Sequence, residues 1–414
     1  MGMQDELSLE KKKSNLLLAL LVSTLFYKIA VPSSFNTSVF SLLMSLPFSV
    51  VSQYTRTINI YQFPLIGICA QILVLLFSFF LLRGKLIIRP GSPIFWMKGI
   101  LLIRILSYLL FSKGSFSIYY IIELVLLLIT AAFVESIRLR DYSSISKKCL
   151  IFIEVYGVIS AITAICYYYQ VVGAQILVFR NFRISGIYPE AVSVSFLYGL
   201  AIYSALHRIM GGYGKKRVAL YLIELGILFC GGLMSGSRSF LIFLAMAVLF
   251  VVFSMHGRKV WLLVIVISLL TLTAYFLFHD YFVVDIESMT DAARSQKIKI
   301  ATDVFLNHPV FGVGTSNYRI YEAQAGFKGT NPHNMLFELL CENGIVGFFA
   351  YIGLILSIAQ SLIRKRKKYI KISTVCIVFW FAISMVVGVF SNQFLMTLLI
   401  IFLFIIENEP APSE

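Results

Sequence analysis

Apolar runs recur along the whole chain, from Leu16 to Ile406, and short polar segments separate them. Each run has roughly 16–24 residues, which is enough for an α-helix to cross about 30 Å of hydrocarbon. The alternating ten-residue pattern of β-barrel strands is absent from the sequence, and helices are the other way to satisfy the backbone in lipid. The pattern predicts an all-α, polytopic integral membrane protein with a single domain over residues 1–414.

Basic residues between the apolar runs predict which segments stay in the cytoplasm. They cluster at 11–13, 83–89, 138–148, 208–217, 258–259 and 364–371. The first apolar run lacks a cleavage site, so we expect it to be retained as a helix. The weak run 38–51, which contains Pro47, is expected to lie at the interface, and its crossing as an extra span is the alternative.

This assignment gives about twelve spans, or thirteen if the weak run also crosses. It places the segments 173–189, 235–237 and 280–332 outside. The expected spans after the first lie at about 60–82, 94–112, 116–137, 149–172, 190–207, 218–234, 238–255, 259–279, 333–363, 371–390 and 393–406.

Composition agrees with the pattern. Hydrophobic residues make up 59% of the chain and charged residues 13%, whereas soluble domains carry about a quarter charged residues. The net charge of +15 does not indicate nucleic acid, because the basic residues sit in short segments between spans. The six cysteines are scattered without metal-like spacing and are expected to be core residues. The charged residues inside spans, Arg104, Glu123, Glu154 and Glu224, are expected to pair with one another or to line the core.

The outer segment 280–332 has about fifty residues, which is long for a connection without a function. Within it, Ile298, Ala301 and Val304 recur at helical spacing, opposite Lys297. This spacing predicts an amphipathic helix that lies on the membrane surface.

Three expected helix starts on the outer side share polar and basic residues. One follows Arg183, the second is the Ser-Gly-Ser-Arg sequence at 235–238, and the third is Asn-Pro-His-Asn at 331–334. Pro and a polar cap residue favour a helix start, and the free N–H groups there attract anions. The forked guanidinium groups of Arg183 and Arg238 suit phosphate oxygens. Together they predict a phosphate or pyrophosphate site, although Arg238 as a membrane anchor and Arg183 as a lipid contact stay alternatives.

His333 is expected in the first turn of its helix, where the positive helix end favours a neutral imidazole. A neutral imidazole can accept a proton near pH 7, which suits activation of a hydroxyl. Asn334, Glu338 and Glu342 follow at helical spacing and form one polar stripe. An unpaired carboxylate in the membrane costs roughly 2.5–3.5 kcal/mol, so the two glutamates should face protein or a cavity, as buried partners or as substrate contacts.

Five motifs occur in a characteristic order along the second half of the chain. They are Arg183-x-x-Gly186, Ser235-Gly-Ser-Arg238, His308-Pro309-x-Phe311-Gly312-x-Gly314, His333-Asn334-x-x-x-Glu338 and Glu342-x-Gly344-x-x-Gly347. We interpret the third as a structural turn. In this order they resemble the O-antigen ligase and Wzy-type polymerase superfamily of bacterial membrane glycosyltransferases. The resemblance is close over about 180–350, and elsewhere it extends only to hydropathy.

The resemblance implies a GT-C-like, all-helical fold in the bacterial cytoplasmic membrane, with a site on the outer face. Its members transfer glycan from undecaprenyl pyrophosphate to an acceptor hydroxyl, without a cofactor or a required metal. Arg183 and Arg238 would then bind pyrophosphate, and His333 would activate the acceptor. Further candidate contacts to donor or acceptor are Arg180, Ser237, Asn334, Tyr318, Glu338 and Glu342. The implied partners are an undecaprenyl-pyrophosphate-linked oligosaccharide donor, a glycan acceptor, membrane lipids, a flippase and a chain-length regulator.

Three functions remain open on the sequence. A polymerase of repeat units, for capsule or O-antigen, is favoured because the chain is compact and lacks an added outer domain. A ligase would use the same chemistry and transfer the finished glycan to lipid A-core, to a protein or to cell wall. A flippase for lipid-linked oligosaccharide is the third, but transporters of this size should show paired halves, whereas here the polar motifs gather late in the chain.

Overall fold

The computed structural model describes the chain with gaps, and every structural statement below refers to the residues that it describes. These are 3–25, 31–32, 60–61, 64–81, 86–111, 118–137, 142–172, 191–210, 215–235, 237–254, 290–327, 332, 334–364, 372–385, 390 and 392–408.

Over these residues the fold consists of thirteen helices and one short strand pair, which agrees with the predicted all-helical class. The helices are α1 (Met3–Leu25), α3 (Pro64–Leu81), α4 (Pro93–Phe111), α5 (Ile118–Ser136), α6 (Tyr142–Val172), α7 (Ala191–Met210), α8 (Lys215–Met234), α9 (Arg238–Ser254), α12 (Thr290–Asn307), α13 (Tyr318–Gln324), α14 (Met335–Arg364), α15 (Ile372–Ser384) and α16 (Gln393–Asn408).

Several of these helices indicate an integral membrane protein. Four are long and apolar enough to cross a membrane, and they lie in α4, α6, α7 and α14. Shorter apolar helices accompany them in α3, α8, α9, α15 and α16. On the outside of the bundle α3 exposes Phe77 by 60% and Phe80 by 74%, as expected of side chains that face lipid. The predicted total of about twelve spans stays a prediction, because the expected span at 259–279 lies outside the described residues.

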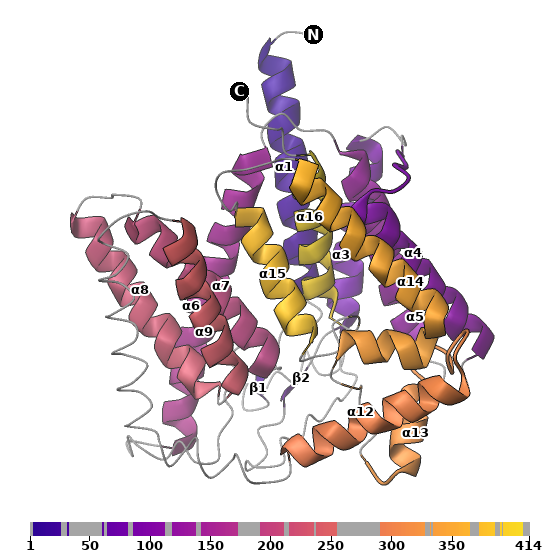
Figure 1. Cartoon of the computed structure of the whole chain (residues 1–414). Helices are drawn as coiled ribbons and strands as arrows, with labels where there is room; N and C mark the ends of the chain where they lie inside the picture. Colours follow the sequence, from indigo (N-terminus) through magenta and orange to yellow (C-terminus); the bar gives the residue numbers. More distant parts are fainter. Residues whose placement is uncertain are drawn as a thin grey trace.

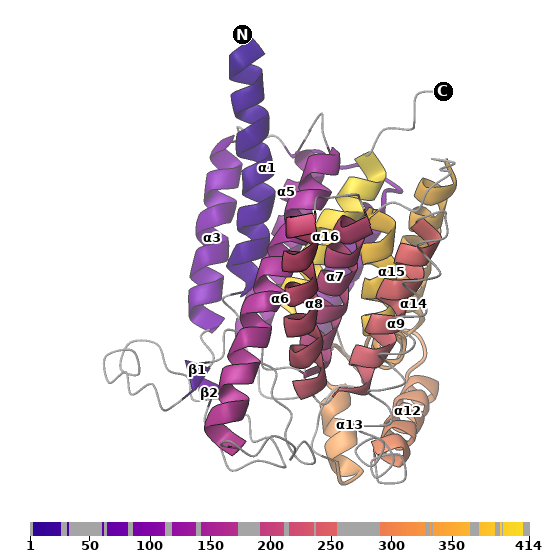
Figure 2. The ribbon, with the colours of Figure 1, turned by 90° about the vertical axis from the view of Figure 1, so that its left-hand side faces the viewer.

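The helices form a bundle around α16, as Figures 1 and 2 show. Residues from Gln393 to Ile406 of α16 are buried throughout. The start of α1 and the end of α16 lie at one end of the bundle, and α12 and α13 lie across the opposite end. We call this second end the α12 face.

Two short strands lie near the α12 face. β1 (Val31–Pro32) and β2 (Ile60–Tyr61) pair antiparallel, with Val31 opposite Tyr61. The pairing also places Pro32 opposite Ile60. The predicted interfacial run 38–51 lies outside the described residues.

Candidate active site

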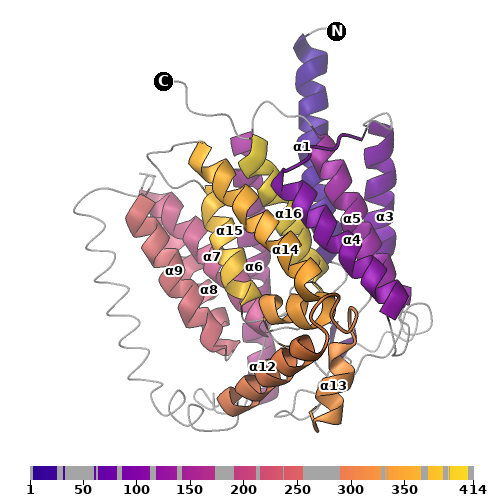
Figure 3. The ribbon, with the colours of Figure 1, turned by 45° about the vertical axis from the view of Figure 1, so that its right-hand side comes forward.

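The span predicted at 333–363 corresponds to an apolar helix long enough to cross a membrane, Met335–Ile363, but α14 is broken near its start. Gly344 has φ 62° and ψ −157°, which no helix accommodates, and it divides α14 into a short piece at 335–343 and a long piece at 345–364. Figure 3 shows the short piece above α12 and turned away from the axis of the long piece. A positive φ of this kind strongly favours glycine, which explains Gly344 in the motif.

The segment 309–314, which we call the glycine loop, fills this break. A helix break in an apolar environment frees backbone groups that must find partners. Here the loop supplies them in both directions. The N–H groups of Val313 and Gly314 donate to the carbonyls of Cys341 and Glu342, at 2.9 Å each, and the N–H of Ile345 donates to the carbonyl of Pro309 at 2.8 Å.

Close backbone approach explains the glycines on both sides. A Cβ on Gly344 would overlap the Val310 carbonyl and lie 2.7 Å from the nitrogen of Gly312. A Cβ on Gly312, whose φ is 67°, would overlap the backbone of Glu342. The interpretation of the His308-Pro309 motif as a structural turn is therefore confirmed.

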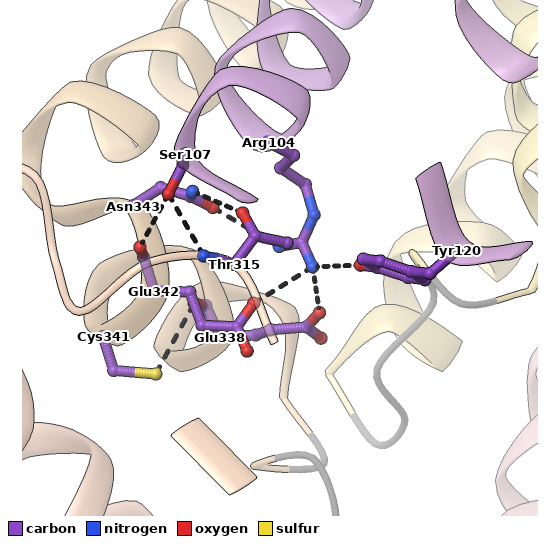
Figure 4. Close-up of polar contacts among 8 residues, drawn as sticks. All are labelled: Arg104, Ser107, Tyr120, Thr315, Glu338, Cys341, Glu342 and Asn343. Atoms are coloured by element: carbon purple, nitrogen blue, oxygen red, sulfur yellow. Dashed lines mark hydrogen bonds and ion pairs between the residues drawn. The ribbon is translucent and has the colours of Figure 1, made fainter. Parts of the chain in front are cut away.

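A buried ion cluster lies beside the glycine loop and is drawn in Figure 4. Nη2 of Arg104, in α4, lies 2.9 Å from Glu338 Oε1 and 3.1 Å from Glu342 Oε2. The same nitrogen donates to the hydroxyl of Tyr120, in α5, at 2.8 Å. The guanidinium carbon lies 4.3 Å from the ring centroid of Phe390, just before α16. The three charged side chains are at most 2% exposed.

Further hydrogen bonds tie the cluster to Thr315, which directly follows the glycine loop. The amide of Asn343 donates to Thr315 Oγ1 at 2.9 Å and accepts from Arg104 Nη1 at 3.4 Å. Ser107, one turn beyond Arg104, accepts from the Thr315 N–H at 3.1 Å and donates to the Glu342 carbonyl at 3.4 Å. The short piece of α14, the end of α4 and the loop therefore form one hydrogen-bonded unit.

Two buried polar atoms of the cluster make no hydrogen bond among the described residues. These atoms are Glu338 Oε2 and Arg104 Nε. Arg319, an exposed residue of α13, interacts electrostatically with Glu338 and Glu342. Two carboxylates are thus held between a buried cation and one nearer the surface.

The expectation that the charged residues inside spans pair with one another or line the core is met in part, because Arg104 and Glu154 are buried and Glu224 hydrogen-bonds with Glu154. Arg104 pairs with the polar stripe of α14, whereas Glu154 pairs with Arg208 at 2.9 Å. Sequence reasoning missed this match although both signals were present. An arginine inside an apolar span and two carboxylates on another helix each need a partner of opposite charge.

Two of the three predicted helix starts meet at the α12 face. α7 begins at Ala191 and α9 at Arg238, and the hydroxyls of Ser195 and Ser235 lie 3.1 Å apart. Ser193 also accepts a hydrogen bond from Asn392, ahead of α16, at 3.4 Å. Ser237 lies in this turn, where its N–H donates to the hydroxyl of Ser235 at 3.4 Å.

The third predicted start lies against the end of α15, three residues later than expected. The sequence places the cap at Asn331, but the observed cap is Asn334, whose Oδ1 accepts from the N–H groups of Leu336 and Phe337 at 2.9 and 3.3 Å. Its Nδ2 donates to the carbonyl of Met385 at 3.3 Å. α14 accordingly begins at Met335, and His333, which is predicted in the first turn, lies outside the described residues.

The residues with predicted chemical roles are described only in part. Arg180, Arg183 and His333 lie outside the described residues. Arg238 is the first residue of α9, and its side chain also lies outside the description. Their roles therefore stay predictions.

Tyr318 has a packing role. Its side chain is completely buried, and its hydroxyl donates to the carbonyl of Lys297 in α12 at 2.9 Å. Burial raises the pKa of the Tyr318 hydroxyl, and nearby Glu322 raises it further, so the group is neutral. Lys297 also forms an ion pair with buried Glu322 at 2.8 Å. These contacts fasten α13 to α12, and the predicted contact of Tyr318 with donor or acceptor stays a prediction.

α12 lies within the predicted outer segment 280–332 and packs on the short piece of α14. Its buried Ala301 and Val304 form a small apolar cluster with Val313, Tyr318 and Cys341. The predicted location of this helix at the membrane surface stays a prediction. Next to it, a cleft of about 490 Å³ opens beside the glycine loop. Its lining is Leu110, Phe111, His308, Pro309, Val310, Phe311, Gly312, Val313 and Tyr321.

A comparison with protein families now places this part of the chain. Residues 224–352 match the O-antigen ligase family (Wzy_C), which confirms the resemblance inferred from the motifs over this stretch. The match contains the α8–α9 turn, α12, the glycine loop, α13 and the start of α14, whereas Arg104 lies outside it. No curated protein matches the chain.

Proposed function

From the O-antigen ligase family match over residues 224–352, we propose that this protein is a membrane glycosyltransferase that acts on polyprenyl-pyrophosphate-linked glycan. It polymerises oligosaccharide repeat units into surface polysaccharide at the outer face of the bacterial cytoplasmic membrane. The observation that carries the proposal is the extent of the match. It covers two of the three predicted helix starts and the glycine loop, the elements around which buried polar side chains gather.

In this proposal the acceptor hydroxyl attacks the anomeric carbon of the lipid-linked glycan. The new C–O bond forms as the bond from that carbon to the pyrophosphate breaks, and the polyprenyl pyrophosphate leaves with the electron pair. His333 takes the hydroxyl proton, while Arg183, Arg238 and the free N–H groups at the helix starts hold the departing pyrophosphate. Ser237, Asn334 and Arg180 contact the donor or acceptor nearby. The reaction needs no metal.

A ligase is the second candidate, because the matched family is described by that activity. A polymerase and a ligase share the bond-forming step and differ in the acceptor. The product of a deletion strain separates them. Single lipid-linked repeat units indicate the loss of a polymerase, whereas long chains that stay on the lipid carrier indicate the loss of a ligase.

A reconstituted assay tests the proposal directly. Purified protein is mixed with lipid-linked repeat units and EDTA, and the products are resolved by length. Wild-type protein should produce ladders of longer glycans. His333→Ala and Arg238→Ala should each lower the rate of elongation. For Arg238, a preorganised charge stabiliser, the expected loss is about 10²–10³-fold. His207→Ala is the matched control, because His207 lies in the last turn of α7, away from its start.

Each outcome has a distinct meaning. Ladders from both the wild type and His333→Ala would remove the histidine from the chemistry. If the wild type does not elongate an authentic donor but does transfer it to lipid A-core, the ligase is correct. Movement of lipid-linked glycan across vesicles without any transfer would replace the enzyme with a flippase.

A further inference from the structure

Arg104 holds a part of the molecule that the break in α14 uncouples from the rest of its own helix. The break at Gly344 separates the short piece of α14 from the long membrane-crossing piece. The short piece carries Asn334 at its start, directly after His333. Its position therefore depends on its contacts with other elements, namely the glycine loop, α4, α12 and the end of α15.

One side chain supplies most of the charged contacts. Nη2 of Arg104 contacts Glu338, Glu342 and Tyr120 within 3.1 Å, and Nη1 reaches Asn343. Glu338 and Glu342 lie one helical turn apart, so a single guanidinium holds two successive turns of the short piece. The planar fork of a guanidinium fixes both the distance and the orientation of the carboxylates that it binds, whereas the ammonium group of a lysine does not fix their orientation.

We propose that Arg104 is a positioning residue that sets the location of the α14 start, and with it His333, relative to the rest of the site. The inference rests on the proposed function, because it assigns to His333 the role given there. Arg104 itself touches no substrate: it is 1% exposed, and its contacts are with protein. It acts through Glu338 and Glu342.

The buried oxygen Oε2 of Glu338 supports this assignment. It has no hydrogen-bond partner among the described residues although the side chain is 2% exposed. A cluster built for stability alone would be expected to satisfy this oxygen, because an unmade hydrogen bond in the interior is costly. Arg104 donates to Oε1 of the same carboxylate and does not donate to Oε2.

Activity is the first test, with Arg104→Lys as the variant. Lysine keeps the charge and much of the volume but replaces the fork by a point charge. We expect kcat to fall by about tenfold to a hundredfold, because a displacement of about 1 Å at a reacting group has such an effect. KM should stay within about twofold, since Arg104 does not contact substrate. Arg89→Lys is the control, because Arg89 pairs with Glu407 in a partly exposed ion pair away from the site. An unchanged kcat in Arg104→Lys would overturn the proposal.

Cross-linking is the second test and needs no substrate. Cysteines at 334 and 385, in a background without native cysteines, report the contact of Asn334 with the Met385 carbonyl. A short bifunctional thiol reagent should join Asn334→Cys to Met385→Cys rapidly in an otherwise intact cluster. Added Arg104→Lys should slow the reaction by about tenfold, whereas added Arg89→Lys should not. Equal rates with and without Arg104→Lys would overturn the proposal.

The two tests fail differently. If the wild type shows no glycan transfer but Arg104→Lys slows cross-linking, Arg104 positions the α14 start and the proposed function is wrong. If the wild type is active and Arg104→Lys changes neither kcat nor cross-linking, the proposed function stands and Arg104 has no positioning role.

Discussion

Gly344→Ala should destabilise the protein strongly, because two separate effects act at this position. The backbone at φ 62° and ψ −157° is strained for any residue with a side chain, at about 1–3 kcal/mol. The added Cβ would also overlap the carbonyl of Val310 and press on the nitrogen of Gly312. These are backbone atoms of the glycine loop and cannot rotate away, so overpacking adds about 1–3 kcal/mol. The expected total is about 2–6 kcal/mol.

The measurement is the unfolding free energy in detergent micelles, followed by helicity during titration with a denaturing detergent. Gly226→Ala is the matched control. An added Cβ at Gly226 meets no atom within 4 Å, and this residue lies within α8. Alanine favours a helix over glycine by roughly 0.5–1 kcal/mol, so the control should keep or gain stability. If Gly344→Ala stays within about 0.5 kcal/mol of Gly226→Ala, which is the spread of a neutral surface change, the insertion of the glycine loop into α14 is wrong.

Four further predictions concern stability and protection. Arg104→Ala should cost about 3–5 kcal/mol in the same titration because it leaves two buried carboxylates without their cation, whereas Arg89→Ala at a partly exposed pair should cost about 0–1 kcal/mol. Asn334→Ala should cost about 0.5–2 kcal/mol through loss of the cap, and an unchanged free energy would contradict the observed cap. Tyr318→Phe should lower the unfolding free energy by about 0.5–1.5 kcal/mol below pH 10, because it removes a hydrogen bond. Burial raises the pKa of Tyr318 in the folded protein, so above pH 10 the hydroxyl ionises first in the unfolded state. This ionisation destabilises the wild type, and the difference in unfolding free energy between wild type and Tyr318→Phe should shrink as the pH rises. In hydrogen exchange the Val313 amide should be protected like a helical amide, and rapid exchange there would contradict its bond to α14.

Helix bounds were largely predictable from the sequence. The expected spans 94–112 and 238–255 correspond to α4 and α9 within one residue at each end. The reason is that polar or glycine-rich residues interrupt long apolar runs at both ends of these helices. Such signals are local, so they can be interpreted without knowledge of the partner helices.

The break in α14 could not be predicted in the same way. A glycine within an apolar run is compatible with a helix, and Gly344 leaves the helical conformation because the glycine loop supplies replacement hydrogen bonds. The place of the loop is a tertiary contact that no local pattern encodes. The cap at Asn334 could not be predicted either, because Asn331 offered an equally good cap by residue type.

The spacing of residues along the sequence could not identify the partner of Arg104 either. Several carboxylates inside spans were available to it, and Glu338 lies 234 residues away along the chain. Charge balance shows that each group needs a partner, but it does not say which one. Only the packing of α4 against α14 makes the choice.

The wide separation of Arg104 and Glu338 in sequence has a consequence for the biogenesis of the protein. At about 5–20 residues per second, a ribosome makes Glu338 roughly 12–47 s after Arg104. During this interval α4 must reside in the membrane with its arginine unmatched by the two carboxylates, a state that costs about 2.5–3.5 kcal/mol at the centre of a helix. Tyr120 of α5 follows after 16 residues and offers the first partner. A nascent chain that stalls before α14 therefore holds Arg104 in the membrane without its two carboxylate partners, whereas the completed chain buries it among them.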